Sequence, residues 1–212
     1  MFRDFYRNVK LLWSCRQENS RDFGRIFKLM RVYEKLDGAI TRFRWKTGIH
    51  CAKGCGQCCE NPYVEATVLE MLPLAAALIR RNEAQRWLQG DQPEYEKGRC
   101  PFYQPDGQVA WKGRCSVYPL RPLICRMFGY SGKKDKEDKK QYYTCERIET
   151  QFRDICQRIN HQKTDTALPM MEDYSMQRLE LAREIDRNLY PLPLALKKAL
   201  ERIGFQRQLC RK

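Results

Sequence analysis

Cysteine residues are concentrated in the middle of this sequence, and they constrain the possible fold more than any other feature. The 212-residue chain holds 11 cysteines, and eight of them lie between Cys51 and Cys145. The first four fall within a stretch that also contains Gly54, Gly56 and Pro62, which interrupt regular secondary structure. A loop of this composition needs something to order it, and a bound metal converts binding free energy into folding free energy.

The amino-terminal residues help to decide whether the cysteines form disulfides or bind metal. Residues 1–15 carry charges throughout and lack the apolar core and the small-residue cleavage site of a signal peptide. The sequence also lacks the apolar run of about 18 residues that predicts a membrane-spanning helix. We therefore expect a cytoplasmic protein. In that reducing compartment, dense cysteine indicates metal binding rather than disulfides.

The spacing of the cysteines favours convergence on metal. Thiolates two or three residues apart on a glycine-bearing loop can share an ion, and sulfur ligands suit zinc or an iron–sulfur centre. We predict that the metal ligands are the eight central cysteines: Cys51, Cys55, Cys58, Cys59, Cys100, Cys115, Cys125 and Cys145. Compact pairs are typical of Zn²⁺ sites, whereas a compact run with scattered partners is typical of an iron–sulfur cluster, here a [4Fe–4S] form. Both cofactors remain open from the sequence.

The number of sites also remains open, since eight thiols can form two four-ligand sites or one site with spare thiols. We expect one cluster, held by three cysteines of the first loop and by Cys115 or Cys125, because this needs the fewest distant ligands. Cys58 and Cys59 are expected to differ, because neighbouring side chains of an extended chain point to opposite sides. They would then bind different metals, or one of them would bind none.

Three blocks of this sequence resemble a known family. They read CGQCC from Cys55 to Cys59, VEAT from Val64 to Thr67 leading to Glu70, and GRCSVYPLRPLICR from Gly113 to Arg126. In these blocks the chain resembles the YkgJ-type cysteine-cluster family, a zinc- or iron-chelating domain with a CxxCxxCC motif. The resemblance covers roughly Cys51 to Cys145, and it departs from the motif in the first gap, which has three residues instead of two. It implies metal chelation and, in some family labels, Fe–S oxidoreductase activity, but no substrate.

Two arginines lie inside the third block, Arg121 and Arg126. A cluster of thiolates keeps a negative charge after metal binding, and neighbouring guanidinium groups can offset that charge and donate hydrogen bonds to sulfur. We expect both arginines to lie beside the ligands. Pro119 and Pro122 are expected to fix the extended path that brings Cys115 and Cys125 together. His50 is a weaker ligand candidate, and Cys156 is expected to be a small buried residue.

Outside the cysteine-rich centre, apolar periodicity predicts helices. The expected helices are one capped by Ser20 with a stripe from Phe23 to Phe43, one from Thr67 with Glu70 in a capping box, and three more in the carboxyl-terminal third. The last three carry stripes over 148–159, 176–189 and 194–203. Pro73 is expected to divide its helix, and Gly204 is expected to cap the last one. A small hairpin is predicted around residues 105–107.

The predicted fold class is therefore mainly α, with helices around an irregular cysteine-rich metal-binding centre and a small β-hairpin. We expect an amino-terminal helical extension over 1–48, a metal-binding domain over 49–148 and a carboxyl-terminal helical extension over 149–212.

The predicted function is metal binding, with a redox or catalytic role as the finer prediction; whether the protein is an enzyme is left open. The alternative is a zinc-stapled basic scaffold for a macromolecule such as nucleic acid. The net charge of +14 favours such partners, but it is scattered along the chain, so nucleic-acid binding should be weak. Substrate, protein partner and oligomeric state are not predicted.

Overall fold

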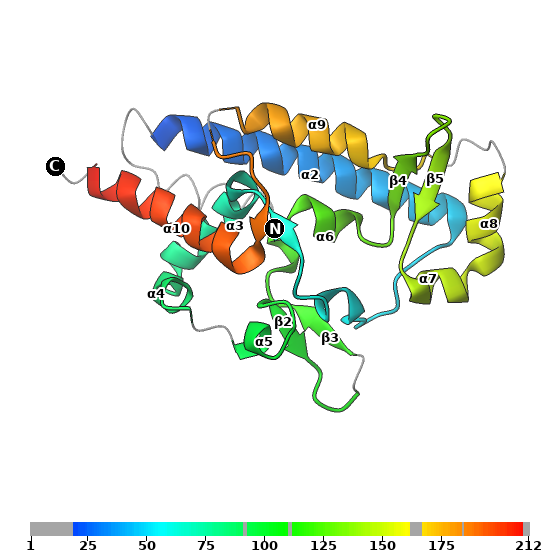
Figure 1. The fold of residues 1–212 in the computed structure, drawn as a ribbon, viewed down its shortest axis with the longest axis horizontal. Coiled ribbons are helices and arrows are strands. Elements are labelled where there is room, and N and C mark those ends of the chain that lie inside the picture. Colours follow the sequence, from blue (N-terminus) through cyan, green and yellow to red (C-terminus); the bar gives the residue numbers. More distant parts are fainter. Residues whose placement is uncertain (1–18, 91–92, 110–111, 162–166, 184, 210–212) are drawn as a thin grey trace.

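The computed structural model describes residues 19–90, 93–109, 112–161, 167–183 and 185–209. Residues 1–15 and Cys210 lie outside these residues. Two helix pairs dominate the described part of the chain (Figure 1). Helix α2 (Asn19–Thr47) runs beside α9 (Met171–Leu181), and α3 (Val68–Arg80) packs against α10 (Leu192–Leu209). The segments before and after the cysteine-rich centre therefore share one hydrophobic core with it.

Helix α2 presents the predicted apolar stripe to this core. Met30, Tyr33, Leu36, Ile40 and Phe43 are buried, as periodicity at three and four residues predicts. Two details differ from the prediction. Phe27 is 40% exposed, and Asn19 is already helical, so that Ser20 lies inside the helix.

Helix α3 begins with the predicted capping box. The Thr67 hydroxyl accepts a hydrogen bond from the Glu70 backbone N–H, and the Glu70 carboxylate accepts one from the Thr67 N–H. The predicted break at Pro73 is wrong, because one helix continues through it to Arg80. A proline inside a helix costs about 3 kcal/mol. Every residue from Val68 to Leu78 is buried, and full burial of a leucine side chain returns roughly 1.5–3 kcal/mol, so packing outweighs the lost hydrogen bond.

Glu70 does more than cap its own helix. Its buried carboxylate also accepts hydrogen bonds from the Tyr33 hydroxyl of α2 at 3.3 Å, the Leu123 N–H of α6 (Leu123–Met127) at 2.9 Å and the Arg178 guanidinium of α9 at 3.0 Å. Because these partners come from three other helices, one carboxylate fixes their positions relative to α3. A buried carboxylate is tolerated where hydrogen bonds and a cation satisfy it.

The strands form three short antiparallel pairs in the described residues. Strand β2 (Tyr103–Pro105) pairs with β3 (Gly113–Cys115), which confirms the predicted hairpin. Strand β4 (Ser131–Lys134) pairs with β5 (Lys140–Tyr143), so a second hairpin encloses the lysine-rich segment 133–140. Strand β1 (Glu65–Ala66) pairs with β6 (Tyr190–Pro191).

The remaining elements are short, and several boundaries correct the sequence predictions. The expected helix over 148–159 divides into α7 (Glu146–Gln151) and α8 (Arg153–His161) at Phe152. Helix α9 ends at Leu181 rather than Leu189, and α10 continues through Gly204, which therefore does not cap it. The other elements are α4 (Ala84–Leu88), α5 (Pro93–Glu96) and the 3₁₀ helices η1 (Gln57–Cys59) and η2 (Tyr118–Leu120).

The predicted fold class is thus confirmed: the chain is mainly helical, with cysteines gathered in irregular segments and small hairpins beside them. Among the described residues, no helix combines the length and the apolar character required to cross a bilayer.

Candidate metal centre

The cysteine-rich loop that follows α2 is held by contacts to later parts of the chain. The Cys51 N–H donates to the Tyr130 hydroxyl at 2.9 Å. Cys55 forms an isolated bridge with Lys112, and the Gly113 N–H donates to the Gly54 carbonyl at 2.9 Å. The Cys100 N–H donates to the Cys59 carbonyl at 2.8 Å. These bonds hold the loop against the β2–β3 hairpin, against the segment that precedes it and against Tyr130.

Tyr103 packs between this loop and the hairpin, and two glycines make room for it. A Cβ atom added at Gly56 would lie 2.4 Å from the Tyr103 ring, and one added at Gly113 would lie 2.2 Å from it. The Tyr103 hydroxyl donates to the Lys112 carbonyl at 3.1 Å. The glycine of the CGQCC block is therefore required by packing.

Cys58 and Cys59 lie in the 3₁₀ turn η1, and their sulfur atoms are 4.0 Å apart. The prediction that they differ assumed an extended chain, and this premise is wrong. In a tetrahedral site with metal–sulfur bonds of 2.3 Å, neighbouring sulfurs are about 3.8 Å apart. The turn therefore gives this adjacent pair a spacing that one ion can bridge.

A first set of thiols gathers around Cys59, and we call Cys58, Cys59, Cys100 and Cys115 the inner thiol group. Hydrogen bonds with the thiols of Cys100, Cys115 and Cys58 raise the pKa of Cys59 far above its usual range. The same contact with Cys59 lowers the pKa of Cys100 and of Cys115, and it lowers that of Cys58 to about 7. The group therefore shares protons that a bound cation would displace.

Cys125, on α6, lies next to the inner thiol group. Burial raises the pKa of its thiol, and the nearby thiols of Cys100 and Cys115 raise it further. The Cys125 thiol therefore interacts with the inner thiol group through charge. The direct contacts between thiols in that group are made by Cys59.

The other three cysteines form a second set, Cys51, Cys55 and Cys145, which we call the outer thiol group. Although Cys51 is exposed, the loss of water around its thiol raises its pKa to about 12, and contact with Cys55 and the nearby Cys145 adds to this shift. Cys145 is the residue that precedes α7. All three line a cavity of about 470 Å³, together with Gln57 and residues of α7.

Arg121 lies beside the inner thiol group. Its guanidinium stacks on the Tyr118 ring with 3.6 Å between its central carbon and the ring centroid, and it donates to the Tyr118 and Cys125 carbonyls at 3.0 and 3.3 Å. Its positive charge contributes to the lowered pKa of Cys115 and of Cys58, after their contact with Cys59. This position suits a group that stabilises thiolates.

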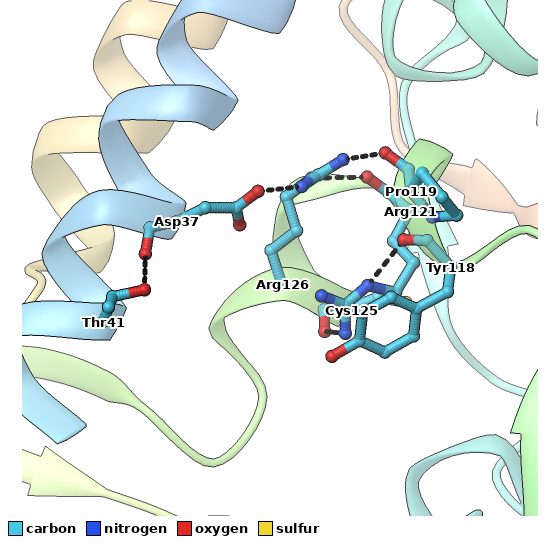
Figure 2. A network of polar contacts seen from close by, with 7 residues as sticks. All are labelled: Asp37, Thr41, Tyr118, Pro119, Arg121, Cys125 and Arg126. Carbon is cyan, nitrogen blue, oxygen red and sulfur yellow. Dashed lines mark hydrogen bonds and ion pairs between the residues drawn. The ribbon is translucent and has the colours of Figure 1, made fainter. Parts of the chain in front are cut away.

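Arg126 makes different contacts, which are visible in Figure 2. Its buried guanidinium donates to Asp37 of α2 at 2.7 Å, to the Arg121 carbonyl at 2.9 Å and to the Pro119 carbonyl. It also lies over the Tyr33 ring, at 4.3 Å from the centroid. Arg126 therefore holds the segment between Cys115 and Cys125 against α2.

Sequence reasoning did not identify some of the residues that build this region. Glu70 and Arg126 are connected through Tyr33, whose hydroxyl donates to Glu70 and whose ring faces Arg126. The resemblance contained both motif residues but gave no indication of Tyr33. The weaker candidate His50 directs Nδ1 to the Gly48 carbonyl at 2.8 Å and packs on Phe152. Cys156 is buried, as predicted.

The donor chemistry fits zinc or iron, but the thiols are not yet in metal-binding positions. Within the described part of the chain, no three Cys, His, Asp or Glu side chains meet the geometry of a metal site as they stand. The inner group nevertheless supplies four thiols around one residue at a spacing near a tetrahedral edge. Side-chain adjustment would be needed to close them on an ion.

Comparison with known proteins agrees with this chemistry. Residues 50–146 match the family model of the CxxCxxCC domain, described as "Putative zinc- or iron-chelating domain". The YkgJ-type resemblance fits that family. The match supports binding of zinc or iron in general terms. No curated protein and no solved structure showed a significant match.

Proposed function

We propose that this protein is a metalloprotein with two centres, a closed one in the inner thiol group and an open one in the outer thiol group. The observation that carries the proposal is the spatial division of the cysteines. Cys59 contacts Cys58, Cys100 and Cys115, whereas Cys51 contacts Cys55 and lies near Cys145. This division differs from the single cluster expected from sequence, because it follows the fold rather than the order of the residues.

The inner centre has the features of a structural site. Its ligands would come from η1, from the start of the β2 segment and from β3, so one ion would hold three irregular segments together. Four thiolates complete a tetrahedral shell, which is typical of a structural zinc site. The 4.0 Å spacing of Cys58 and Cys59 favours a single zinc or iron ion over a larger iron–sulfur cluster. Arg121 would offset part of the remaining negative charge.

The outer centre would provide the working site of the protein. It offers three thiols beside a cavity, and three protein ligands with an open position are typical of catalytic metal sites. A redox or catalytic role is the function class that this arrangement supports. We also keep the division into a metal-binding segment, 49–148, and two helical extensions as part of the proposal.

Metal stoichiometry tests the two centres. The protein is purified anaerobically, and zinc, iron and acid-labile sulfide are measured for the parent, Cys100→Ser and Cys145→Ser. Each variant should lose about one equivalent and keep the other. Loss of all metal in both variants would contradict two centres, and less than about a tenth of an equivalent in the parent would contradict metal binding itself. Acid-labile sulfide with a brown colour would show an iron–sulfur cluster instead of a single ion.

A matched pair of variants tests the ligand set of the inner centre. Cys58→Ser should reduce metal retention there, because Cys58 contacts Cys59 directly, whereas Cys125→Ser should leave it nearly unchanged. The opposite result would assign Cys125 as the fourth ligand.

The alternative, a basic scaffold for nucleic acid, makes a separate prediction. With the charge of +14 spread along the chain, binding to a short duplex should be weaker than about micromolar and should fall steeply with salt. Fluorescence anisotropy at two salt concentrations measures this. Sub-micromolar affinity that persists at high salt would favour the scaffold.

A further inference from the structure

The exposed charges of helix α2 are all basic among the residues that the structure describes. Six basic side chains are exposed on this helix: Lys28, Arg31, Lys35, Arg42, Arg44 and Lys46. Its acidic residues are buried or half-buried, and arginines of α10 and α6 hold Asp22 and Asp37. Within the described part of the chain, none of the six basic residues forms a salt bridge. The fold therefore concentrates on one helix a charge that is scattered in the sequence.

Four of these basic residues follow one line along the helix with a tryptophan. We call this set the α2 line: Lys28, Arg31, Lys35, Arg42 and Trp45. Steps of three, four and seven residues place its members on one face, over a length of about 25 Å at 1.5 Å per residue. Gly38 lies on the same face. A Cβ atom added there would meet one side-chain atom within 4 Å, Nη1 of Arg42 at 3.6 Å, and nothing from another described element, so the face is open.

The acidic groups nearest to this face leave its positive charge in excess. Helix α9 lies beside α2 (Figure 1) and carries Glu172, which accepts the Lys134 N–H, and the exposed Asp173 and Glu180. Glu34 of α2 is half-buried. None of these four carboxylates forms a salt bridge with another described residue, and the six exposed cations of α2 outnumber them. The complementary partner of this face is therefore a polyanion.

Trp45 indicates which polyanion fits. Its exposed fraction is 87%, although an indole ring is among the largest apolar groups that a fold can bury. Unpaired bases stack on exposed aromatic rings, and the phosphates of a single strand follow Lys and Arg side chains. A duplex keeps its bases stacked inside. An anionic membrane takes up a helix through a broad apolar face, whereas the apolar side of α2 is buried in the core.

We propose that the exposed face of α2 binds single-stranded nucleic acid, with the basic residues of the α2 line at its phosphates and an unpaired base stacked on Trp45. Residues 1–18 of the same chain do not complement this face, because they carry four basic and two acidic residues. The proposal goes beyond the metal centres and requires neither of them. It is also compatible with weak binding of a duplex, which offers no base to Trp45.

The salt dependence of binding tests the phosphate contacts. A fluorescent oligouridylate of about 12 nucleotides is titrated with the full chain at several salt concentrations, and anisotropy measures binding. Each neutralised phosphate of a single strand contributes about 0.7 to the slope of log K against log salt concentration. Alanine at three positions of the α2 line, Arg31, Lys35 and Arg42, should therefore reduce this slope by about two and weaken binding at least tenfold at low salt.

A matched triple variant controls for net charge. It removes three exposed basic side chains from α8 and α10 instead: Arg153→Ala, Arg158→Ala and Lys197→Ala. Because alanine is a good helix former, both triple variants should keep the fold, and thermal unfolding checks this. The control should leave the salt slope unchanged. An equal loss of slope and affinity in both variants would show that net charge alone governs binding, and would overturn the proposed face.

Replacement of Trp45 tests the stacked base. Trp45→Ala should weaken oligouridylate binding about tenfold, which lies within the range for base stacking on an aromatic ring, and should leave the salt slope unchanged. Trp45→Phe should keep most of the affinity, because a phenyl ring also stacks. Neither variant should change the binding of a duplex of the same length. Equal affinity of Trp45→Ala and the parent for oligouridylate would overturn the stacking contact.

Two other polyanions decide whether the partner class is correct. The parent and Trp45→Ala are also titrated with vesicles of phosphatidylcholine and phosphatidylserine in equal parts, and with poly-L-glutamate. Both should bind more weakly than oligouridylate at the same concentration of negative charge, and Trp45→Ala should change neither. If the vesicles bound as tightly and depended on Trp45, the partner would be a membrane surface. The same result with poly-L-glutamate would indicate an acidic protein, and absence of oligouridylate binding would overturn the proposal outright.

Discussion

The helical part of the molecule and the cysteine-rich part are ordered by different forces. Around α2, α3, α6 and α9, order comes from apolar packing and from the buried Glu70 carboxylate, whose partners are all within the protein. Around the thiols, the chain follows short strands, 3₁₀ turns and loops, and the inner group has three thiols in contact with that of Cys59. The first part is therefore satisfied by its own contacts, whereas we propose that the second is completed by a metal.

Removal of the metal should have the largest effect and should separate the two parts. A strong chelator is expected to abolish protection in residues 51–59 and 99–130, because metal binding supplies their folding free energy. Amides of α2, α3 and α10 should stay protected. Hydrogen exchange with mass spectrometry measures both parts in one experiment. Equal loss of protection everywhere would show that the helical part also depends on the metal.

The buried carboxylate is the critical group of the helical part. Glu70→Ala removes the partner of Arg178, Leu123 and Tyr33, and loss of one member of a buried ion pair typically costs about 3–5 kcal/mol. Denaturant unfolding of the metal-loaded protein should show this loss. Glu65→Ala, at an exposed position on the same segment, is the control and should change stability by less than about 0.5 kcal/mol.

A second buried charge, Arg126, connects the two parts. Arg126→Lys keeps the charge but cannot reach Asp37, the Pro119 carbonyl and the Arg121 carbonyl together. Loss of these contacts, made by a buried guanidinium to half-buried acceptors, should lower the free energy of unfolding by about 2–4 kcal/mol. Arg158→Lys, at an exposed position on α8, is the control. If metal affinity also fell tenfold or more, Arg126 would position the Cys115–Cys125 segment for the ligands. A loss of stability without any change in metal affinity would show that Arg126 stabilises the helical part only.

Contacts between residues close in the sequence could be predicted, whereas contacts between residues far apart in the sequence could not. The capping box of Thr67 and Glu70 was predictable because its partners are three residues apart. The longer-range role of Glu70 was not, because Tyr33 and Arg178 lie 37 and 108 residues away. Helix α10 passes Gly204 because the residues before it, such as Leu196, Ala199 and Leu200, are anchored in the core. Tertiary packing therefore determines the features that local sequence signals did not predict.

The same limit applies to the candidate site. Spacing identified the central cysteines and suggested that the compact loop would act as one unit. The structure divides that loop instead: Cys51 and Cys55 lie near Cys145, whereas Cys58 and Cys59 lie with Cys100 and Cys115. This division depends on the η1 turn and on how the β2–β3 hairpin packs against it, and neither is encoded in the spacing of the thiols.

The smallest expected effect concerns the glycine that admits Tyr103. In Gly113→Ala, the new methyl group would lie 2.2 Å from the Tyr103 ring, which must move, and such overpacking costs about 1–3 kcal/mol. The ring lies between the CGQCC loop and the hairpin, so the cost should fall on the cysteine-rich part and should also reduce metal retention in the inner centre.

Gly24→Ala is the matched control for this change. Gly24 lies inside α2, and a Cβ atom added there would meet nothing within 4 Å. Alanine is the better helix former by about 1 kcal/mol, so this variant should be slightly more stable, with unchanged metal content. Thermal unfolding and metal analysis of both variants check the contrast. If Gly113→Ala kept full stability and full metal content, the ring of Tyr103 would have room to move, and the loop and the hairpin would not depend on its packing.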